Sequence, residues 1–500
     1  MSQAEKLFEK LLEHVKAASK FEYAASLLEW DQETKMPPKG AEGRAEIFAA
    51  VKTEGFKIFT SEEVGKILKE LMKEKEKLDV NKQALVQRIN EVYHRTKAIP
   101  TDLFKTFNET KSKAYHIWVE AKNKSDFKIF TPSLEKILEI RRRFAELYGY
   151  EKNPYDGLLP DYEPGLTAED LRTIVKDLRR ELVPFVQTLL DKADKPNEKI
   201  LEGNFPENLQ HEFSLEVLKA LGYDFDRGRL DTTVHPFTIG VGPDDVRVTT
   251  NYNVKKLDSA LFATIHECGH ALYDQGKDAL LKWIYMDTGY SHGVHESQSR
   301  MMENMVGRSL AFWKFFYPKL QSYFPSFRKV PVEEFYRAVN AVKPSLIRIF
   351  ADEVTYNLHI MLRFEIEEAM LKGDVEVKEL PALWNEKMQE YLGITPKKDS
   401  EGVLQDVHWS MGYIGYFPSY MLGNLYAAQL FATAKQEIKD LEEKIAQGKF
   451  NILLTWLRNK VHRFGLIYEA PQLLKEVTGQ GPTSKPWLEY IKEKFTKIYI

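Results

Sequence analysis

The stretch from Leu257 to Gly276, LDSALFATIHECGHALYDQG, constrains the fold of this chain more than any other. Its apolar side chains recur at the spacing of one helical face, at Leu257, Leu261, Ile265, Cys268 and Leu272. Asp258 or Ser259 could cap the start of such a helix, and Gly276 could end its last turn. We therefore expect one continuous helix across the stretch.

This predicted helix carries the sequence His266-Glu267-Cys268-Gly269-His270. Because residues four apart lie on one helical face, His266 and His270 can present two imidazole nitrogens to a single metal ion. Zinc-type hydrolysis needs such neutral ligands, an open coordination position and a carboxylate that takes a proton from water, a role that suits Glu267. The alternative is a buried helix whose two histidines simply have hydrogen-bond partners.

A third ligand is expected in the segment from His292 to Arg300, HGVHESQSR. Glu296 is favoured, because two histidines and one glutamate leave the fourth coordination position open for catalysis. Glu303 follows seven residues later on the same face, where it could accept a hydrogen bond from a ligand histidine. His292 and His295 remain rival ligands, and a closed site built from extra histidines would argue against catalysis.

Charge and cysteine content exclude several classes of protein. The 500 residues include 71 basic and 74 acidic side chains, so no general attraction to nucleic acid or to an anionic membrane is expected. The N-terminus has the pattern of a charged amphipathic helix rather than a signal peptide. Cys268 is the only cysteine, which excludes an intrachain disulfide. We expect a cytoplasmic protein, and its 29% of charged residues, rich in Lys and Glu, suits a heat-adapted source.

The remaining pattern predicts a mainly α-helical protein. From Met1 to about Pro196, helical segments are separated by short breaks such as Met36 to Gly40. Two pairs are typical of capping boxes, Thr60 with Glu63 and Thr167 with Asp170. No internal repeat or low-complexity linker divides the chain, so we expect a single catalytic domain over residues 1–500.

The pattern changes between Tyr223 and Asn253, where Gly and Pro separate short β-branched runs such as Val246 to Thr250. These runs predict a hairpin or a small three-stranded sheet directly before the metal helix. An edge strand in this place could pair with the backbone of an extended peptide. The alternative is a sheet with a structural role only.

Further motifs follow one another between Val234 and Trp409. They are His235-Pro236-Phe237, Asp245-Val246-Arg247-Val248-Thr249, the two metal motifs, Ile347-Arg348-Ile349-Phe350-Ala351-Asp352, and Gly402-Val403-Leu404-Gln405-Asp406-Val407-His408-Trp409. Together with Trp30-Asp31-Gln32-Glu33-Thr34-Lys35-Met36-Pro37, they resemble the thermostable carboxypeptidase 1 family of metallocarboxypeptidases. The resemblance covers nearly the whole chain. It implies a two-lobed helical body with a deep groove, a small sheet beside the site, and a homodimer.

The resemblance also implies roles for single residues. It assigns His266, His270 and Glu296 to the metal and Glu267 to the general base, in agreement with the residue patterns. It adds Arg348 as the partner of the substrate's C-terminal carboxylate, for which a guanidinium offers a planar fork. The alternative for Arg348 is an ion pair with Asp352 four residues later on one helix.

Four more side chains are candidates for contact with substrate. The Arg247 motif is expected at the groove wall, and Arg247 and His235 are further substrate-binding candidates. Tyr420 and His408 could donate to the oxygen that becomes negative during attack, by analogy with related helical metallopeptidases. Tyr420 could equally be a core residue.

We expect a metal-dependent carboxypeptidase that releases single amino acids from the C-termini of peptides, with one zinc or cobalt ion per chain. One rival is an endo-oligopeptidase or dipeptidyl carboxypeptidase with the same metal site, because the zinc motif does not encode the position of the cut. Another is a helical binding protein with a structural metal, in which a fourth protein ligand would close the site.

Overall fold

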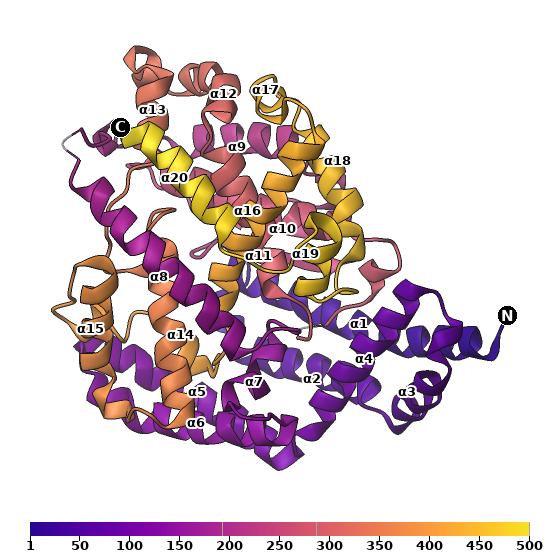
Figure 1. The fold of residues 1–500 in the computed structure, drawn as a ribbon. Helices are drawn as coiled ribbons and strands as arrows, with labels where there is room; N and C mark the ends of the chain where they lie inside the picture. Colours follow the sequence, from indigo (N-terminus) through magenta and orange to yellow (C-terminus); the bar gives the residue numbers. More distant parts are fainter. Residues whose placement is uncertain (193, 287, 500) are drawn as a thin grey trace.

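The computed structural model describes residues 1–192, 194–286 and 288–499. Helices make up most of this part of the chain, as the sequence predicts, and one three-stranded sheet lies among them (Figure 1). The helices α10, α11 and α16 occupy the middle of the molecule, with other helices around them.

The N-terminal helices form a second hydrophobic cluster together with Leu281, Ile284, Leu466 and Ile467 from later in the chain. They are α1 (Gln3–Thr34), α2 (Ala41–Phe59), α3 (Glu62–Glu74) and α4 (Val80–Ala98). Phe8, Leu68 and Ile89 from three of these helices are completely buried in that cluster. Figure 1 shows this part in indigo, at the end of the molecule where the N-terminus lies.

The next helices lead to the sheet. They are α5 (Thr101–Lys124), α6 (Phe127–Tyr148), α7 (Pro154–Leu158), α8 (Ala168–Leu190) and α9 (Glu207–Leu221). The predicted capping box of α8 is confirmed, because Thr167 and Asp170 each accept the other's backbone N–H. The predicted box at Thr60 and Glu63 is wrong. Ser61 caps α3 by accepting from the N–H of Val64, while the hydroxyl of Thr60 donates to the carbonyl of Phe56 in the preceding helix.

The predicted sheet is confirmed and consists of β1 (Leu230–Thr232), β2 (Thr238–Gly242) and β3 (Asp245–Thr250), in the order β1-β3-β2. β1 pairs parallel to β3 with Leu230 opposite Val248, and β2 pairs antiparallel with Thr238 opposite Val248. Val246 and Val248 are buried, which fixes the face of β3 that packs on the core. Because β3 lies in the middle of the sheet, β2 is an edge strand, and it contacts α10.

The metal helix is α10 (Leu257–Gly276), with the predicted bounds. Its predicted cap is wrong, because the cap position is Lys256, which makes no side-chain cap, and Asp258 lies in the first turn. The segment after α10 leads into α11 (His292–Arg300), which continues as a π-helical turn, η7 (Met301–Gly307).

The C-terminal half is again helical. It contains α12 (Leu310–Tyr323), α13 (Val332–Ala338), α14 (Tyr356–Lys372), α15 (Leu380–Leu392), α16 (Pro418–Glu437), α17 (Leu441–Ala446), α18 (Asn451–Lys460), α19 (Ala470–Thr478) and α20 (Lys485–Tyr499). The large side chains of Trp313, Trp384 and Trp487 are completely buried in the core that these helices share with α5 to α11.

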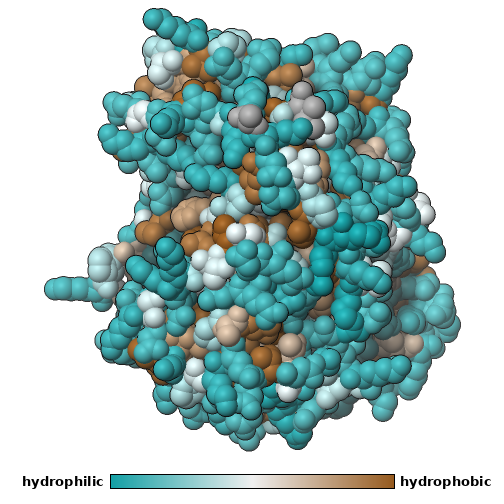
Figure 2. Space-filling view, turned by 60° about the vertical axis from the view of Figure 1, so that its left-hand side comes forward, coloured by the Kyte–Doolittle hydropathy of each residue, from teal (hydrophilic) through white to brown (hydrophobic). Residues whose placement is uncertain are grey.

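The face of the molecule in Figure 2 is mostly hydrophilic, with hydrophobic residues in small separate patches. None of the helices that the structure describes is long and apolar enough to cross a membrane.

Candidate metal centre

Helices α10 and α11 bring the predicted ligands together. Nε2 of His266 and Nε2 of His270 lie 3.8 Å and 3.5 Å from Oε2 of Glu296. The helices can approach this closely because Gly269 has no side chain: a Cβ there would lie 2.4 Å from Cα of Ser299. A Cβ at Gly423 of α16 would likewise collide with the side chain of Glu296. Two glycines therefore allow three helices to meet at the site.

His266 is oriented by Glu303, as predicted. Nδ1 of His266 lies 2.9 Å from Oε2 of Glu303, so a proton on Nδ1 leaves the lone pair of Nε2 free for a metal. Arg300 donates to Oε1 of Glu296 at 2.7 Å and to Oε2 of Glu303 at 3.3 Å. Burial would raise the pKa of Glu303, but Arg300 and His266 lower it to about 2. Arg300 therefore keeps two buried carboxylates ionised.

His270 is held in a different way. Among the described residues its buried Nδ1 has no hydrogen-bond partner, and its ring stacks on that of His295 at 4.4 Å with 16° between the planes. Nε2 of His295 lies 3.5 Å from Asp274 instead of facing Glu296. His292 stacks on Tyr290 at 4.7 Å. Neither rival histidine belongs to the group of ligand atoms that the structure brings together.

Glu267 is buried and points toward the sheet. The hydroxyl of Thr238 in β2 lies 2.8 Å from Oε2 of Glu267 and 2.7 Å from its backbone carbonyl. Cys268, one of the apolar positions of α10, is completely buried, and burial raises the pKa of its thiol.

A groove of about 750 Å³ is lined by neighbours of the centre, His295, which stacks on His270, and Thr238, which contacts Glu267. Its walls come from α1, from the edge strand β2, from α11 and from the start of α16, and they include Thr238, Gly240, His295, His408 and Tyr420. The candidate base is therefore joined through Thr238 to a wall of the groove.

His408 and Tyr420 face each other in this wall, with Nε2 3.2 Å from the tyrosine hydroxyl. Burial lowers the pKa of His408 to about 3, so its imidazole is neutral at physiological pH. Burial raises the pKa of Tyr420 well above its usual value, so its hydroxyl keeps its proton. The pair can therefore offer hydrogen bonds without carrying charge.

Arg348 is buried beside Tyr420, with its guanidinium carbon 4.9 Å from the centre of the tyrosine ring. The alternative of an ion pair with Asp352 is wrong, because Arg348 lies in a short 3₁₀ turn and Asp352 accepts the N–H groups of Val354 and Thr355. The partner of Arg348 is Asp406, at 2.8 Å.

The other two substrate-binding candidates, Arg247 and His235, belong neither to the ligand group nor to the lining of the groove. Arg247 pairs with Asp245 at 2.7 Å, and its guanidinium stacks 4.2 Å from the ring centre of Trp30 in α1. His235 is exposed in the segment before β2. The structure does not bring either residue into contact with the ligand group.

The sequence patterns did not identify three polar residues of this site, Thr238, Arg300 and Arg363. Arg363 donates to Asp406, the partner of Arg348, at 2.7 Å. Arg300 could have been found from its spacing, because it follows Glu296 by four residues on one helix. Thr238 and Arg363 act on residues that are distant in the chain, and no local pattern identifies them.

The donor set fits a divalent ion. Two imidazole nitrogens and one carboxylate oxygen lie within 4.8 Å of one another, and no second group of this kind occurs in the part of the chain that the structure describes. Three such ligands leave a coordination position open.

Comparison with known proteins agrees with this geometry. The family model described as carboxypeptidase Taq (M32) metallopeptidase matches residues 10–495. The chain belongs to this family. As a carboxypeptidase Taq family member, it is a metal-dependent carboxypeptidase, as its motifs predict.

Individual relatives of this family member match over almost their full length. The chain is 41% identical to carboxypeptidase 1 of Bacillus subtilis (strain 168) over 497 residues, and 99% of each chain is covered. It is 39% identical to thermostable carboxypeptidase 1 of Thermus thermophilus, with the same coverage. The crystal structure of an M32 carboxypeptidase from Deinococcus radiodurans R1 superimposes with a TM-score of 0.95 at 36% identity, over 99% of both chains.

Proposed function

We propose that His266, His270 and Glu296 hold one zinc or cobalt ion, and that Glu267 is the general base that serves it. The observation that carries this proposal is the cluster of three ligand atoms, with Glu267 next to His266 on the same helix. When bound, the ion would lower the pKa of water and polarise the substrate carbonyl.

The carboxylate of Glu267 takes the proton of the attacking water and returns it to the leaving amine. The hydrogen bond from Thr238 restricts the rotation of this carboxylate, so that its remaining lone pairs are available to water. Because β2 is an edge strand and lines the groove, the backbone of an extended peptide can pair with it, and this places the last peptide bond near Glu267.

Arg348 binds the free carboxylate at the end of the substrate. Arg348 and Arg363 share the single carboxylate of Asp406, so this buried cluster has one more positive than negative charge. A second carboxylate would balance that charge, and its absence is costly in a water-poor site. The requirement for a carboxylate at this point limits cleavage to the last residue of a peptide. We also propose that Arg247, which follows the groove residue Val246 on β3, and His235, in the segment before β2, limit how the rest of the peptide extends.

Tyr420 donates a hydrogen bond to the carbonyl oxygen as negative charge develops there, and His408 orients the tyrosine hydroxyl. The support for this assignment is the neutral pair described above, in the groove wall beside Arg348.

Product analysis by mass spectrometry tests the function. One peptide is supplied with a free C-terminus, and the same peptide with a C-terminal amide. We expect stepwise loss of single residues from the first only, inhibition by a chelator, and recovery with zinc or cobalt. Internal cleavage would identify an endo-oligopeptidase, and release of dipeptides a dipeptidyl carboxypeptidase. The metal that restores the higher rate at the lower concentration would be assigned as the native ion.

We further propose a homodimer of single-domain chains in the cytoplasm, with peptides rather than nucleic acid or membranes as partners. The resemblance to the family supports the dimer, and the charge balance supports the choice of partners. Light scattering of the purified protein tests the assembly.

A further inference from the structure

The C-terminal helix α20 contacts the turn that carries Glu303. The backbone carbonyl of Asn304, the next residue in this π-helical turn, lies 3.3 Å from Nζ of Lys494 and 3.3 Å from the hydroxyl of Tyr490. Carbonyls in the last turn of a helix lack a partner within the helix, and Asn304 is buried. The hydroxyl of Tyr490 has one hydrogen, which it donates to Glu353, so Lys494 supplies the hydrogen-bond donor for this carbonyl.

The same ammonium group binds a second segment of the site. Nζ of Lys494 lies 2.6 Å from Oε2 of Glu353, and the hydroxyl of Tyr490 donates to Oε1 at 2.7 Å. The side chains of Lys494 and Glu353 are only 8% and 3% exposed. Glu353 follows Arg348 in the segment before α14. Lys494 therefore connects the turn beside the metal ligands with the segment that carries Arg348.

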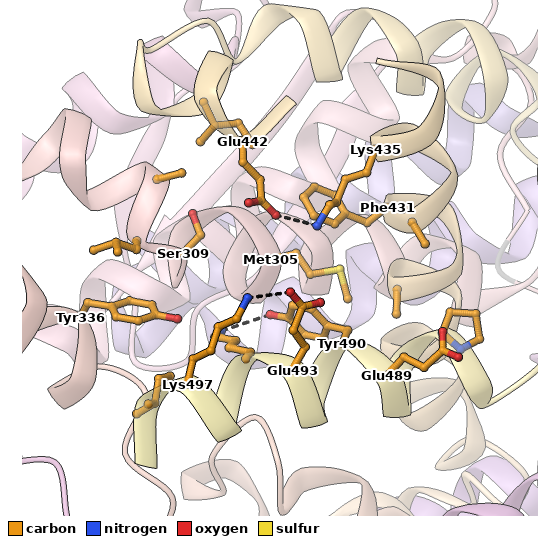
Figure 3. Close-up of a pocket in the computed structure, with 18 of the residues that line it drawn as sticks. Met305, Ser309, Tyr336, Phe431, Lys435, Glu442, Glu489, Tyr490, Glu493 and Lys497 are labelled. Atoms are coloured by element: carbon orange, nitrogen blue, oxygen red, sulfur yellow. Dashed lines mark hydrogen bonds and ion pairs between the residues drawn. The ribbon is translucent and has the colours of Figure 1, made fainter. Parts of the chain in front are cut away.

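Packing alone does not hold this turn on the side of α20. A cavity of about 710 Å³ lies between α12, α16, α17 and α20, and Met305, Tyr490 and Lys494 are among the residues that line it. Figure 3 shows Met305 and Tyr490 next to each other at this cavity. An empty volume contributes no dispersion contacts. Core packing of Met301 and Val306 holds the turn from its other sides, and on the side of α20 the hydrogen bond from Lys494 adds a specific contact.

Electrostatics also connects Lys494 to the metal centre. Burial lowers the pKa of Lys494, and the negative charges of Glu353 and Glu303 oppose this shift. Glu303, the carboxylate that orients His266, is thus one of the charges that act on this ammonium group, and Arg308 acts on it in the opposite direction.

We propose that Lys494 is a positioning residue for the metal centre. By holding the carbonyl of Asn304 it fixes the turn in which Glu303 accepts a hydrogen bond from His266. This inference rests on the proposed role of His266 as a metal ligand, and it predicts that Lys494 controls metal affinity although it touches neither metal nor substrate.

Zinc affinity of the full-length protein, measured by competition with a chromophoric chelator, tests this role. The Lys494→Met variant should bind zinc about tenfold more weakly, the lower end of the range for residues that orient a metal ligand. Lys494→Arg should restore most of the affinity, because a guanidinium can reach both the carbonyl and Glu353. Lys497→Met is the matched control: Lys497 lies on the same helix and cavity, but its partner Glu493 is exposed.

A second variant separates positioning from general stability. Lys494→Met alone leaves Glu353 as an unpaired buried charge and is expected to lower the melting temperature. The double variant Lys494→Met/Glu353→Gln removes that charge and should regain melting temperature without metal, yet still bind zinc about tenfold more weakly. If the double variant regains both, or if no variant changes zinc affinity, Lys494 is only a structural residue and the inference is wrong.

This outcome can be distinguished from failure of the proposed metal ligands. If His266→Ala binds zinc as the wild type does, the ligand assignment fails, whatever the Lys494 variants show. If His266→Ala loses zinc and the Lys494 variants do not weaken binding, only the positioning role fails.

Discussion

Arg348 donates two hydrogen bonds to one carboxylate oxygen of Asp406, from Nε at 3.0 Å and from Nη2 at 2.8 Å. Arg363 donates to the other oxygen, and the hydroxyl of Tyr356 accepts from Nη1 of Arg348 at 3.0 Å. Burial would raise the pKa of Asp406, but the two arginines hold it far below its usual value. The guanidinium of Arg348 is therefore fixed in place before a substrate arrives.

From this arrangement we predict that Arg348→Ala lowers kcat/KM by the equivalent of about 2–4 kcal/mol, in the range for a charged hydrogen-bonded contact. Most of the preference for a free carboxylate over a C-terminal amide should be lost. Steady-state kinetics on the two forms of one peptide measure both effects. Arg247→Ala serves as the control and should keep the preference. If instead Arg247→Ala loses the preference for a free carboxylate and Arg348→Ala keeps it, the substrate carboxylate binds at Arg247.

Removal of the base should separate catalysis from metal binding. Glu267→Gln keeps the size of the side chain and an oxygen that can accept from Thr238, so metal content should stay near that of the wild type. Activity should fall about a thousandfold, because the base acts in both proton transfers. Metal analysis and kinetics on one preparation decide this, and an active Glu267→Gln enzyme would require a different base.

The sequence predicted those parts of the site that depend on neighbours along one helix. The helix α10 and the pairing of His266 with His270 follow from periodicity, because helical spacing places residues four apart on one face. The wrong cap at Thr60 lies one residue from the true cap, Ser61. Helix ends depend on single backbone angles that periodicity does not encode.

Contacts between residues that are far apart in the sequence could not be predicted from periodicity. The alternative partner for Arg348, Asp352, assumed a helix where the backbone forms a 3₁₀ turn, whereas the actual partner, Asp406, is 58 residues away. The contact of Thr238 with Glu267 likewise joins a strand to a helix through the tertiary packing of the sheet on α10. A motif can indicate that Asp406 matters, but only the fold shows which charge it balances.

The third ligand can be tested by metal content. Glu296→Ala removes one of three donors and should lower occupancy strongly. His295→Ala and His292→Ala should retain most of the metal, because neither histidine belongs to the group of ligand atoms. The ring of His295 stacks on His270, and the ring of His292 stacks on Tyr290. Metal analysis after dialysis at equal free zinc compares the three variants. If a histidine variant loses the ion while Glu296→Ala keeps it, the ligand has been misassigned.

The donor in the groove wall is tested by Tyr420→Phe. The ring that packs beside Arg348 stays, and only the hydroxyl is lost. We expect kcat to fall by about 10²–10³, with little change in metal content, as for the loss of one oxyanion donor. His408→Ala should have a smaller effect, because the hydroxyl remains but is no longer oriented. Tyr413→Phe, in the same wall, is the control. Equal rates for Tyr420→Phe and the control would leave Tyr420 as a packing residue.

Glu163 binds the N-terminal end of α11 and is expected to make the stability of the protein depend on pH. It is completely buried at the start of α11, where its carboxylate accepts from the hydroxyl of Ser291 at 2.6 Å and from the N–H of Gly293 at 2.5 Å. Burial raises its pKa from 4.5 to about 7, although these hydrogen bonds oppose the shift. Between these two pH values the folded protein holds a proton that the unfolded chain releases.

The contribution of Glu163 to the free energy of unfolding should therefore fall as pH rises from about 4.5 to 7, and Glu163 should add no further pH dependence above that range. The contribution is at most about 3 kcal/mol, from the size of the shift. Glu163→Gln cannot titrate at this position, so the urea midpoint of the wild type should fall between pH 5 and pH 8 relative to that of the variant. Other buried groups titrate in both proteins, among them Glu367, whose pKa burial raises to about 7, and His408, whose pKa burial lowers to about 3. Glu169→Gln, which changes a glutamate that is 75% exposed on α8, should keep the wild-type slope. A Glu163→Gln variant with that same slope would show that Glu163 stays ionised in the folded protein throughout this range.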